Sequence, residues 1–173
     1  MTLFRRLSIA AVLVLFAGWL AVPAQAQERS NALPRVSPNA AVSQTVGVTE
    51  VRVTYGRPGV RGRTIFGDLV PYGEVWRTGA NEATTISFSS AVQIEGQSLD
   101  AGTYGLFTIP GEDEWTVIFN NTAEQWGAYN YDASQDVLRV TVEPQTVEMT
   151  ELFTVTFPTV SDTSATMHLR WAE

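Results

Sequence analysis

Apolar and polar residues alternate along most of the chain after residue 50. Side chains of a β-strand point alternately to its two faces, so this alternation predicts strands with one buried and one solvent-facing side. The apolar positions form these groups: Val51, Val53 and Tyr55; Ile86 and Phe88; Val92 and Ile94; Trp115, Val117 and Phe119; Leu138, Val140 and Val142; Phe153, Val155 and Phe157; Met167, Leu169 and Trp171. Turn-forming residues such as Pro110-Gly111 and Asn120-Asn121 separate the groups.

Helical patterning is weak beyond the N-terminal segment. No long window shows the apolar spacing of an amphipathic helix, and residues 123–127 are expected to form one helical turn at most. Many short strands joined by frequent turns are typical of all-β domains. We therefore predict a single antiparallel β-sandwich or jelly-roll-like barrel of about eight strands with little helix.

Residues 1–26 have the three parts of a secretory signal peptide. Arg5 and Arg6 form a basic start, an apolar run follows from Leu7 to Val22, and Ala24-Gln25-Ala26 is a small-x-small cleavage site. The apolar run is about 16 residues long, which is shorter than the roughly 20 that a membrane-spanning helix needs. We therefore expect an exported protein, periplasmic or secreted, with no stable membrane span after cleavage.

The remaining chain is long enough for one domain. Removing 26 of the 173 residues leaves 147, which can bury a single core. Residues 27–41 are polar and contain Pro34 and Pro38, so they are predicted to be a flexible tether. Residues 42–173 are predicted to form the β-sandwich domain.

Composition excludes several classes of function. The formal net charge is −7, and loss of Arg5 and Arg6 with the signal makes the mature chain more acidic still, so nucleic acid is not expected as a partner. With one histidine and no cysteine, the usual zinc ligand sets cannot form, and we expect neither a metal nor a cofactor. No Gly-x-Ser-x-Gly elbow is present, so a serine hydrolase is not favoured either.

The segment 55–88 contains the strongest candidate for a binding site, because it alternates arginines with glycines and apolar anchors. Every basic residue of the chain is arginine, whose planar guanidinium can hold a carboxylate, sulfate or phosphate with two hydrogen bonds. The candidate ligand-binding residues here are Arg57, Arg61, Arg63, Trp76, Arg77, Asn81 and Glu82. The alternative interpretation is structural: Arg63 and Arg77 would pair with Glu74 or Glu82 to fasten the loop to the sheet.

A second aromatic loop could complete the site. Trp126 and Tyr129 lie in a turn-rich segment between two predicted strands. If the two loops meet at one end of the sandwich, they would form an aromatic-walled groove with a cationic floor. Trp76 has an alternative role as a lid on the core, because a tryptophan beside a turn often packs inward.

Several short motifs in these loops resemble one known family. They are Arg57-Pro58-Gly59, Gly62-Arg63, Ile65-Phe66-Gly67, Pro71-Tyr72-Gly73, Trp76 to Asn81, and Trp126-Gly127. In this order they resemble domain-of-unknown-function family 2911, a set of exported bacterial proteins, and the resemblance covers nearly the whole mature chain. It implies a secreted, β-rich protein. The family has no established activity, so the resemblance assigns no catalytic residue.

Three functions are compatible with these observations. The first is a binding module for an anionic or carbohydrate-like ligand of the cell envelope. The second is a glycan-directed hydrolase that uses two carboxylates among Glu74, Glu82 and Asp132. The third is a structural or partner-binding envelope protein without a small-molecule site. The sequence offers few candidate catalytic groups, which favours a protein that is not an enzyme. The oligomeric state stays open.

Cleavage after Ala26 should leave Gln27 as the first residue of the exported protein. Intact-mass measurement and N-terminal sequencing of protein recovered outside the cytoplasm would check this. A full-length chain retained in the membrane fraction would contradict it.

Overall fold

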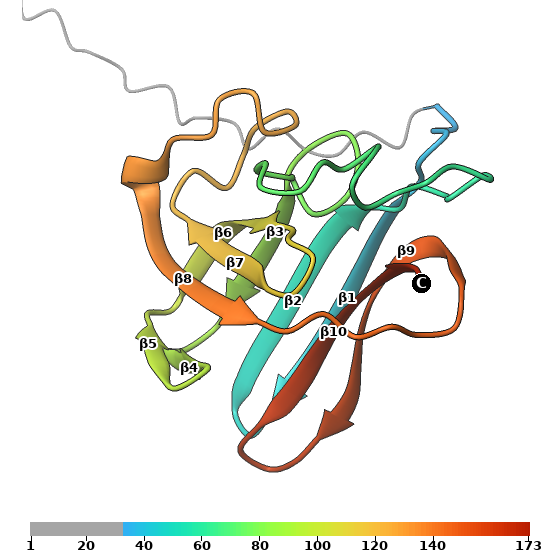
Figure 1. The fold of residues 1–173 in the computed structure, drawn as a ribbon. Coiled ribbons are helices and arrows are strands. Elements are labelled where there is room, and N and C mark those ends of the chain that lie inside the picture. Colours follow the sequence, from blue (N-terminus) through green and yellow to red (C-terminus); the bar gives the residue numbers. More distant parts are fainter. Residues whose placement is uncertain (1–32) are drawn as a thin grey trace, which may run out of the picture.

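The computed structural model describes residues 33–173, so the signal peptide predicted for residues 1–26 lies outside the described part of the chain. Figure 1 shows a fold built almost entirely from strands. The strands are β1 (Asn39–Val46), β2 (Thr49–Gly56), β3 (Thr84–Phe88), β4 (Val92–Ile94), β5 (Gln97–Leu99), β6 (Gly102–Ile109), β7 (Trp115–Asn120), β8 (Asp136–Val142), β9 (Thr150–Val160) and β10 (Ala165–Ala172).

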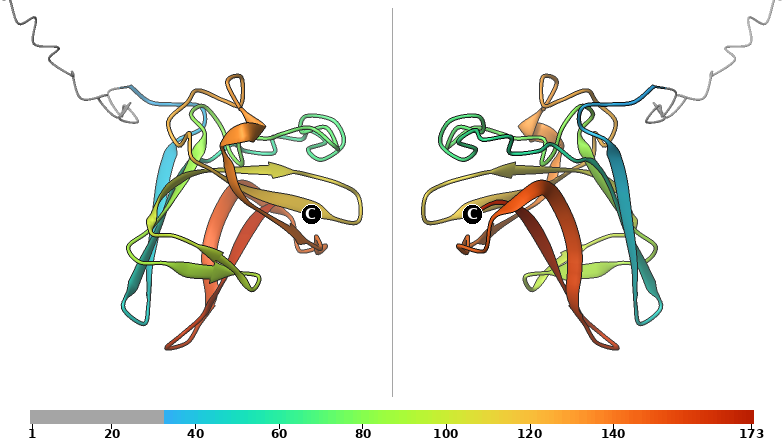
Figure 2. Two further views of the ribbon diagram at one scale, coloured as in Figure 1. Left: turned by 90° about the vertical axis from the view of Figure 1, so that its left-hand side faces the viewer. Right: turned by 90° about the vertical axis from the view of Figure 1, so that its right-hand side faces the viewer.

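Six strands form one antiparallel sheet in the order β1-β2-β3-β6-β7-β8. The hairpin β9–β10 is a separate two-stranded sheet, and Figures 1 and 2 show it lying across one face of the large sheet. Strands β4 and β5 form a small hairpin of their own. The large sheet ends at β1 and β8, which do not pair with each other within residues 33–173, so no closed barrel forms. The predicted antiparallel β-sandwich is confirmed, and the barrel alternative is not the fold.

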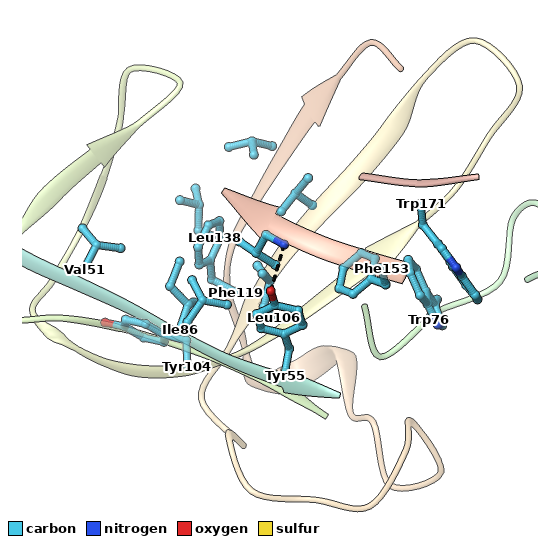
Figure 3. Packing of buried hydrophobic residues seen from close by; sticks show 14 of the residues in the cluster. Val51, Tyr55, Trp76, Ile86, Tyr104, Leu106, Phe119, Leu138, Phe153 and Trp171 are labelled. Carbon is cyan, nitrogen blue, oxygen red and sulfur yellow. Dashed lines mark hydrogen bonds between the residues drawn. The ribbon is translucent and has the colours of Figure 1, made fainter. Parts of the chain in front are cut away.

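The main core lies between the large sheet and the β9–β10 hairpin. Val53, Leu106 and Phe119 from the sheet and Phe153 from the hairpin are all at most 1% exposed. Figure 3 shows these layers meeting through large aromatic and aliphatic side chains. Burial of each such side chain contributes roughly 1.5–3 kcal/mol. The alternating apolar positions of the sequence are therefore the ones that face this core.

A smaller apolar cluster lies on the opposite face of the same sheet. Phe107 of β6 and Ile118 of β7 are fully buried there, and the ring of Tyr131 packs against Phe107 at 5.1 Å between centroids. Val75 and Ala128, from the two long loops, cover the rest of this cluster. Strands β6 and β7 are thus buried on both faces. In β6 consecutive residues are apolar as a result, and this is why its sequence lacks the alternation that marks most of the core strands.

The start of the domain differs from the sequence prediction. A tether is predicted for residues 27–41, but β1 already begins at Asn39 and pairs along its full length with β2. The preceding residues are also held, because Pro38 O accepts a hydrogen bond from the Arg57 backbone N–H at 2.9 Å. Strand β1 is poor in large apolar residues and lies at the edge of the sheet, so its sequence resembles that of a polar linker.

The only helix in residues 33–173 is a single 3-10 turn, Ala133–Gln135. Asp132 caps it by accepting a hydrogen bond from the Ser134 N–H at 2.9 Å. Short polar side chains are preferred at such caps. The sequence allows one helical turn at residues 123–127, but the observed turn lies after that segment. Nothing helical in the described range is long and apolar enough to span a bilayer.

Tyr55 links the sheet to the hairpin through its hydroxyl, which accepts a hydrogen bond from the buried Val155 N–H at 3.1 Å. Tyr55→Phe leaves that N–H without a partner, so we expect the free energy of unfolding to fall by about 1–2 kcal/mol. Urea denaturation measures the change. Tyr72→Phe is the matched control, because Tyr72 is 42% exposed and its loss should change stability by less than ~0.5 kcal/mol. Equal effects of the two substitutions would contradict this role of Tyr55.

Candidate functional site

The loop between β2 and β3 begins with an arginine that fastens it to the hairpin. Arg57 Nε donates to Phe153 O at 2.9 Å, and its Nη2 donates to Thr154 Oγ1 at 2.7 Å. Both partners belong to β9. Arg57 is therefore a structural support, and among the described residues it does not line the cavity described below.

Arg61 and Arg63 hold the loop in shape through backbone carbonyls. Arg61 Nη2 donates to Val36 O at 2.9 Å, while Arg63 donates from Nε to Val60 O at 3.0 Å and from Nη2 to Gly59 O at 2.6 Å. These bonds use only some of the five N–H groups that each guanidinium carries. Both side chains are still able to donate to a ligand.

The ion pairs predicted to fasten the loop do not form. Glu82 pairs with Arg35 instead, through contacts of 2.9 and 2.7 Å from Arg35 Nη1 to the two carboxylate oxygens. Arg63 donates to backbone carbonyls, and the Arg77 side chain has no hydrogen bond or ion pair with another residue of the described range 33–173. The prediction that Arg63 and Arg77 pair with Glu74 or Glu82 is wrong. Arg35 lies in residues 27–41, for which the sequence predicts a flexible tether without ion pairs.

Trp76 lies in the core, as the alternative interpretation of this residue proposed. It is 8% exposed, its ring stacks on Trp171 of β10 at 5.6 Å between centroids with an interplanar angle of 17°, and its edge meets Phe153 (Figure 3). Its indole N–H donates to Gly79 O at 3.1 Å. Trp76 therefore acts as a rigid wall and not as an exposed stacking platform.

A cavity of about 340 Å³ lies beside this wall, within the usual size range of small-molecule sites. Its lining comes from the loop after β2, from β10 and from the residues before β1. The lining residues are Val36, Ser37, Pro58, Gly59, Arg61, Arg63, Leu69, Val70, Trp76, Arg77, Gly79, Ala80, Asn81 and Trp171. Three of them are cationic and none is acidic. The cavity therefore favours a negatively charged occupant.

Two residues of this lining, Arg77 and Trp171, each carry a buried donor without an acceptor. Arg77 Nε and Trp171 Nε1 are both inaccessible to solvent and lack a hydrogen-bond partner within the described part of the chain. Leaving such a group unpaired costs about 1–3 kcal/mol. Burial lowers the pKa of the Arg77 guanidinium from its ordinary value, while the electrostatic effect of Tyr129 acts in the opposite direction. Arginine stays protonated in proteins, so the Arg77 side chain is a half-buried cation with no ion-pair partner among residues 33–173.

The two long loops do meet. Asn81 O accepts a hydrogen bond from the Gly127 N–H at 2.9 Å, and Gln125 O accepts one from the Ala83 N–H at 2.9 Å. Asn81 also donates through its side-chain amide to Ser37 O at 3.1 Å. The contact between the loops brings Tyr129 into electrostatic range of Arg77.

The exposed aromatic residues lie outside the cavity. Trp126 is 50% exposed and Tyr129 is 82% exposed, and neither belongs to the lining. Glu82 is also absent from the lining and is 8% exposed beside Arg35. Of the nine candidate residues named from the sequence, the structure brings five together around the cavity: Arg61, Arg63, Trp76, Arg77 and Asn81.

The carboxylates considered for hydrolysis are not gathered at the cavity. Glu74 is exposed, Glu82 pairs with Arg35, and Asp132 caps the 3-10 turn. None of the three lines the cavity. Within residues 33–173, no group of acidic or histidine side chains is arranged to hold a metal ion.

Asp136 organises a separate polar network. It accepts hydrogen bonds from Asn120 Nδ2 at 2.7 Å, from the Tyr131 hydroxyl at 2.6 Å and from Arg139 Nε at 2.8 Å. Burial and the bond to Asp136 raise the pKa of Tyr131 to about 12. Each side chain of this network has a hydrogen-bond partner within the network. The network therefore supports the loop between β7 and β8.

Trp171 and Ser37 are two of the cavity residues that the sequence does not single out as candidates. Trp171 follows the alternation of a core strand, and nothing in the pattern distinguishes it from an ordinary core residue. Its unpaired N–H becomes visible only when its neighbours are known. Ser37 precedes the first strand in a segment without a motif.

Arg77→Met should raise the free energy of unfolding by about 1 kcal/mol, because it removes a buried donor that has no partner. The matched control is Arg57→Met, which should lower it, because Arg57 donates to Phe153 O and Thr154 Oγ1. Thermal and urea unfolding of both variants measure the difference. A loss of stability in Arg77→Met as large as in Arg57→Met would mean that Arg77 supports the loop.

Comparison with known proteins places this arrangement in a family. No curated protein and no solved structure shows a significant match to the chain. A family model described as "Protein of unknown function (DUF2911)" matches residues 37–173, which include every strand and all of the cavity lining except Val36. This agrees with the family resemblance of the loop motifs. The chain belongs to the DUF2911 family of proteins of unknown function.

Proposed function

We propose that this protein is an exported binding module for a small anionic ligand, which it holds in the arginine-lined cavity. The observation that carries the proposal is that three arginines, Arg61, Arg63 and Arg77, line one cavity whose lining within residues 33–173 contains no acidic residue. An oxyanion supplies hydrogen-bond acceptors and negative charge to such a cluster. It would also provide a counter-charge for the half-buried guanidinium of Arg77.

The charge distribution supports an anion over a neutral ligand. The chain as a whole carries a net charge of −7, yet Arg61, Arg63 and Arg77 converge on a cavity with no acidic residue in the part of its lining that residues 33–173 provide. A concentration of one sign of charge in a recess raises the local concentration of ligands of the opposite sign. The acidic surface elsewhere makes this recess the favoured place for an anion.

Binding without catalysis accounts best for the side chains at hand. Hydrolysis of a glycan needs two carboxylates facing each other across the substrate. Among the described residues, none of those lining the cavity carries a carboxylate, and Glu82 forms an ion pair with Arg35. Export rests on the signal-like residues 1–26, and the absence of cysteine is compatible with an oxidising compartment.

The proposal predicts that a small oxyanion binds to the protein and that Arg77→Met abolishes this binding. Acetate, sulfate and inorganic phosphate would be titrated into the purified protein by calorimetry, with thermal unfolding as a second readout. An anion at about 100 times its Kd should stabilise the fold by about 2.7 kcal/mol. Arg77→Met should raise the Kd at least tenfold, since it deletes a charged hydrogen-bond donor.

Arg52→Met is the matched control. Arg52 lies on β2, is exposed and does not belong to the cavity lining, so its loss should leave anion affinity unchanged. If wild-type protein binds none of the anions, the proposed function is overturned. Equal loss of affinity in both variants would mean that anions bind through the general charge of the protein and not in the cavity.

A further inference from the structure

Two of the three arginines in the cavity lining have no acidic partner within residues 33–173. The Arg63 side chain donates to the backbone carbonyls of Val60 and Gly59, which carry no net charge. The Arg77 side chain has no hydrogen bond or ion pair with another described residue. The lining therefore contains two positive charges that the described chain does not balance.

The third arginine of the lining already has a carboxylate close by. Glu151 Oε1, from β9, accepts a hydrogen bond from the Arg61 backbone N–H at 3.0 Å. A methyl group placed on Gly59 would meet this oxygen at 3.0 Å and Arg61 Nε at 3.4 Å, so the two opposite charges lie near each other. They are not in ion-pair contact, but a charge at this range still offsets part of the positive charge of Arg61.

The ion pair next to the cavity adds no net charge. Glu82 follows Asn81 of the lining, and its carboxylate contacts Arg35 at 2.7 Å. The charges of these two residues cancel. Resting on the function proposed above, we infer that the ligand is a small dianion whose two negative charges match Arg63 and Arg77. A dicarboxylate or a phosphate ester carries this charge.

The two unbalanced arginines differ in their contact with water. Arg63 is exposed and Arg77 is half-buried. Arg77 Nε is closed off from solvent, but its terminal Nη groups, which also lack a partner among residues 33–173, are open to it. Two such N–H groups form a planar fork that can hold two oxygens of one oxyanion. Because water screens the charge of Arg63 more strongly, we expect the second negative charge to add less affinity than the first.

The rest of the protein opposes a second negative charge. With a net charge of −7, the chain repels a dianion more strongly than a monoanion of the same size. A preference for the dianion therefore cannot come from the general charge of the protein. It would report the local positive charge of the cavity.

Ligands of similar size that differ in charge test the inference. Glutarate, its monoamide and tricarballylate carry two, one and three carboxylates, and each would be titrated by calorimetry into the wild-type protein. We expect glutarate to bind about fivefold more tightly than its monoamide, the factor that about 1 kcal/mol represents. Tricarballylate should bind no more tightly than glutarate, because its third carboxylate meets no unbalanced arginine.

Methyl phosphate distinguishes the two sources of a double charge. At about pH 8 its single phosphoryl group carries both negative charges, since the second pKa of a phosphate ester is about 6. Tighter binding of glutarate than of methyl phosphate would assign the charges to two separate carboxylates. The reverse order would assign them to one phosphoryl group, and either dianion should bind more tightly than the glutarate monoamide.

Glu151→Gln should change the preferred charge of the ligand. The substitution keeps an oxygen that can accept from the Arg61 N–H, but it removes the nearby negative charge and leaves a third cation unbalanced. Tricarballylate should then bind several-fold more tightly than glutarate. Glu148→Gln is the matched control, since Glu148 is also exposed but precedes β9 and does not belong to the lining. It should leave the order of the two acids unchanged.

The outcomes distinguish the inference from the function on which it rests. Equal affinity for glutarate and its monoamide overturns the dianion inference and leaves the anion site in place. Tighter binding of tricarballylate than of glutarate by the wild-type protein also overturns it, as would identical behaviour of Glu151→Gln and Glu148→Gln. Failure of every carboxylate, phosphate and sulfate to bind overturns the proposed function itself.

Discussion

Packing around Phe153 holds the three parts of this molecule together. Its ring meets Tyr55 of the sheet at 5.6 Å, Trp76 of the long loop at 5.4 Å and Trp171 of the hairpin at 6.3 Å, each edge to face. Aromatic pairs of this kind contribute about 0.5–1.5 kcal/mol each beyond the area that they bury. Because Trp76 and Trp171 are fixed by these contacts, the cavity beside them has rigid walls. The shape of the candidate site therefore follows from the core.

The arginines of the long loop divide into two kinds. The side chain of Arg57 is hydrogen-bonded to the hairpin. Backbone carbonyls accept hydrogen bonds from some of the N–H groups of Arg61 and Arg63. The guanidinium of Arg77 makes no hydrogen bond with another described residue. A chain under selection for stability alone would gain by losing a half-buried cation of this kind. Trp171, another residue of the cavity lining, also carries a buried donor without a partner, and unpaired groups of this kind are rare in folded proteins.

Sequence patterns located most of the sheet and part of the site. Alternating positions such as Val51, Val53 and Tyr55 do face the core, because one face of their strand is buried and the other is not. Strand β6 does not show this alternation, because apolar residues of the loops cover its second face. Strand β1 escaped it for the opposite reason, because an edge strand needs few large apolar side chains.

The chemistry of the long loop could be named from the sequence, but the pairing of its residues could not. Composition and residue type alone establish a cationic, glycine-rich loop on an antiparallel β domain, because strand periodicity and arginine chemistry are local properties. Which carboxylate meets which arginine depends on contacts between residues far apart in the chain. Arg35 is 47 positions from Glu82 and takes the partner expected for Arg77, and Arg57 reaches across 96 positions to Phe153. Only the tertiary structure decided that Arg77 and Trp171 would share one cavity without an acceptor, because an unpaired group is defined by everything that packs around it.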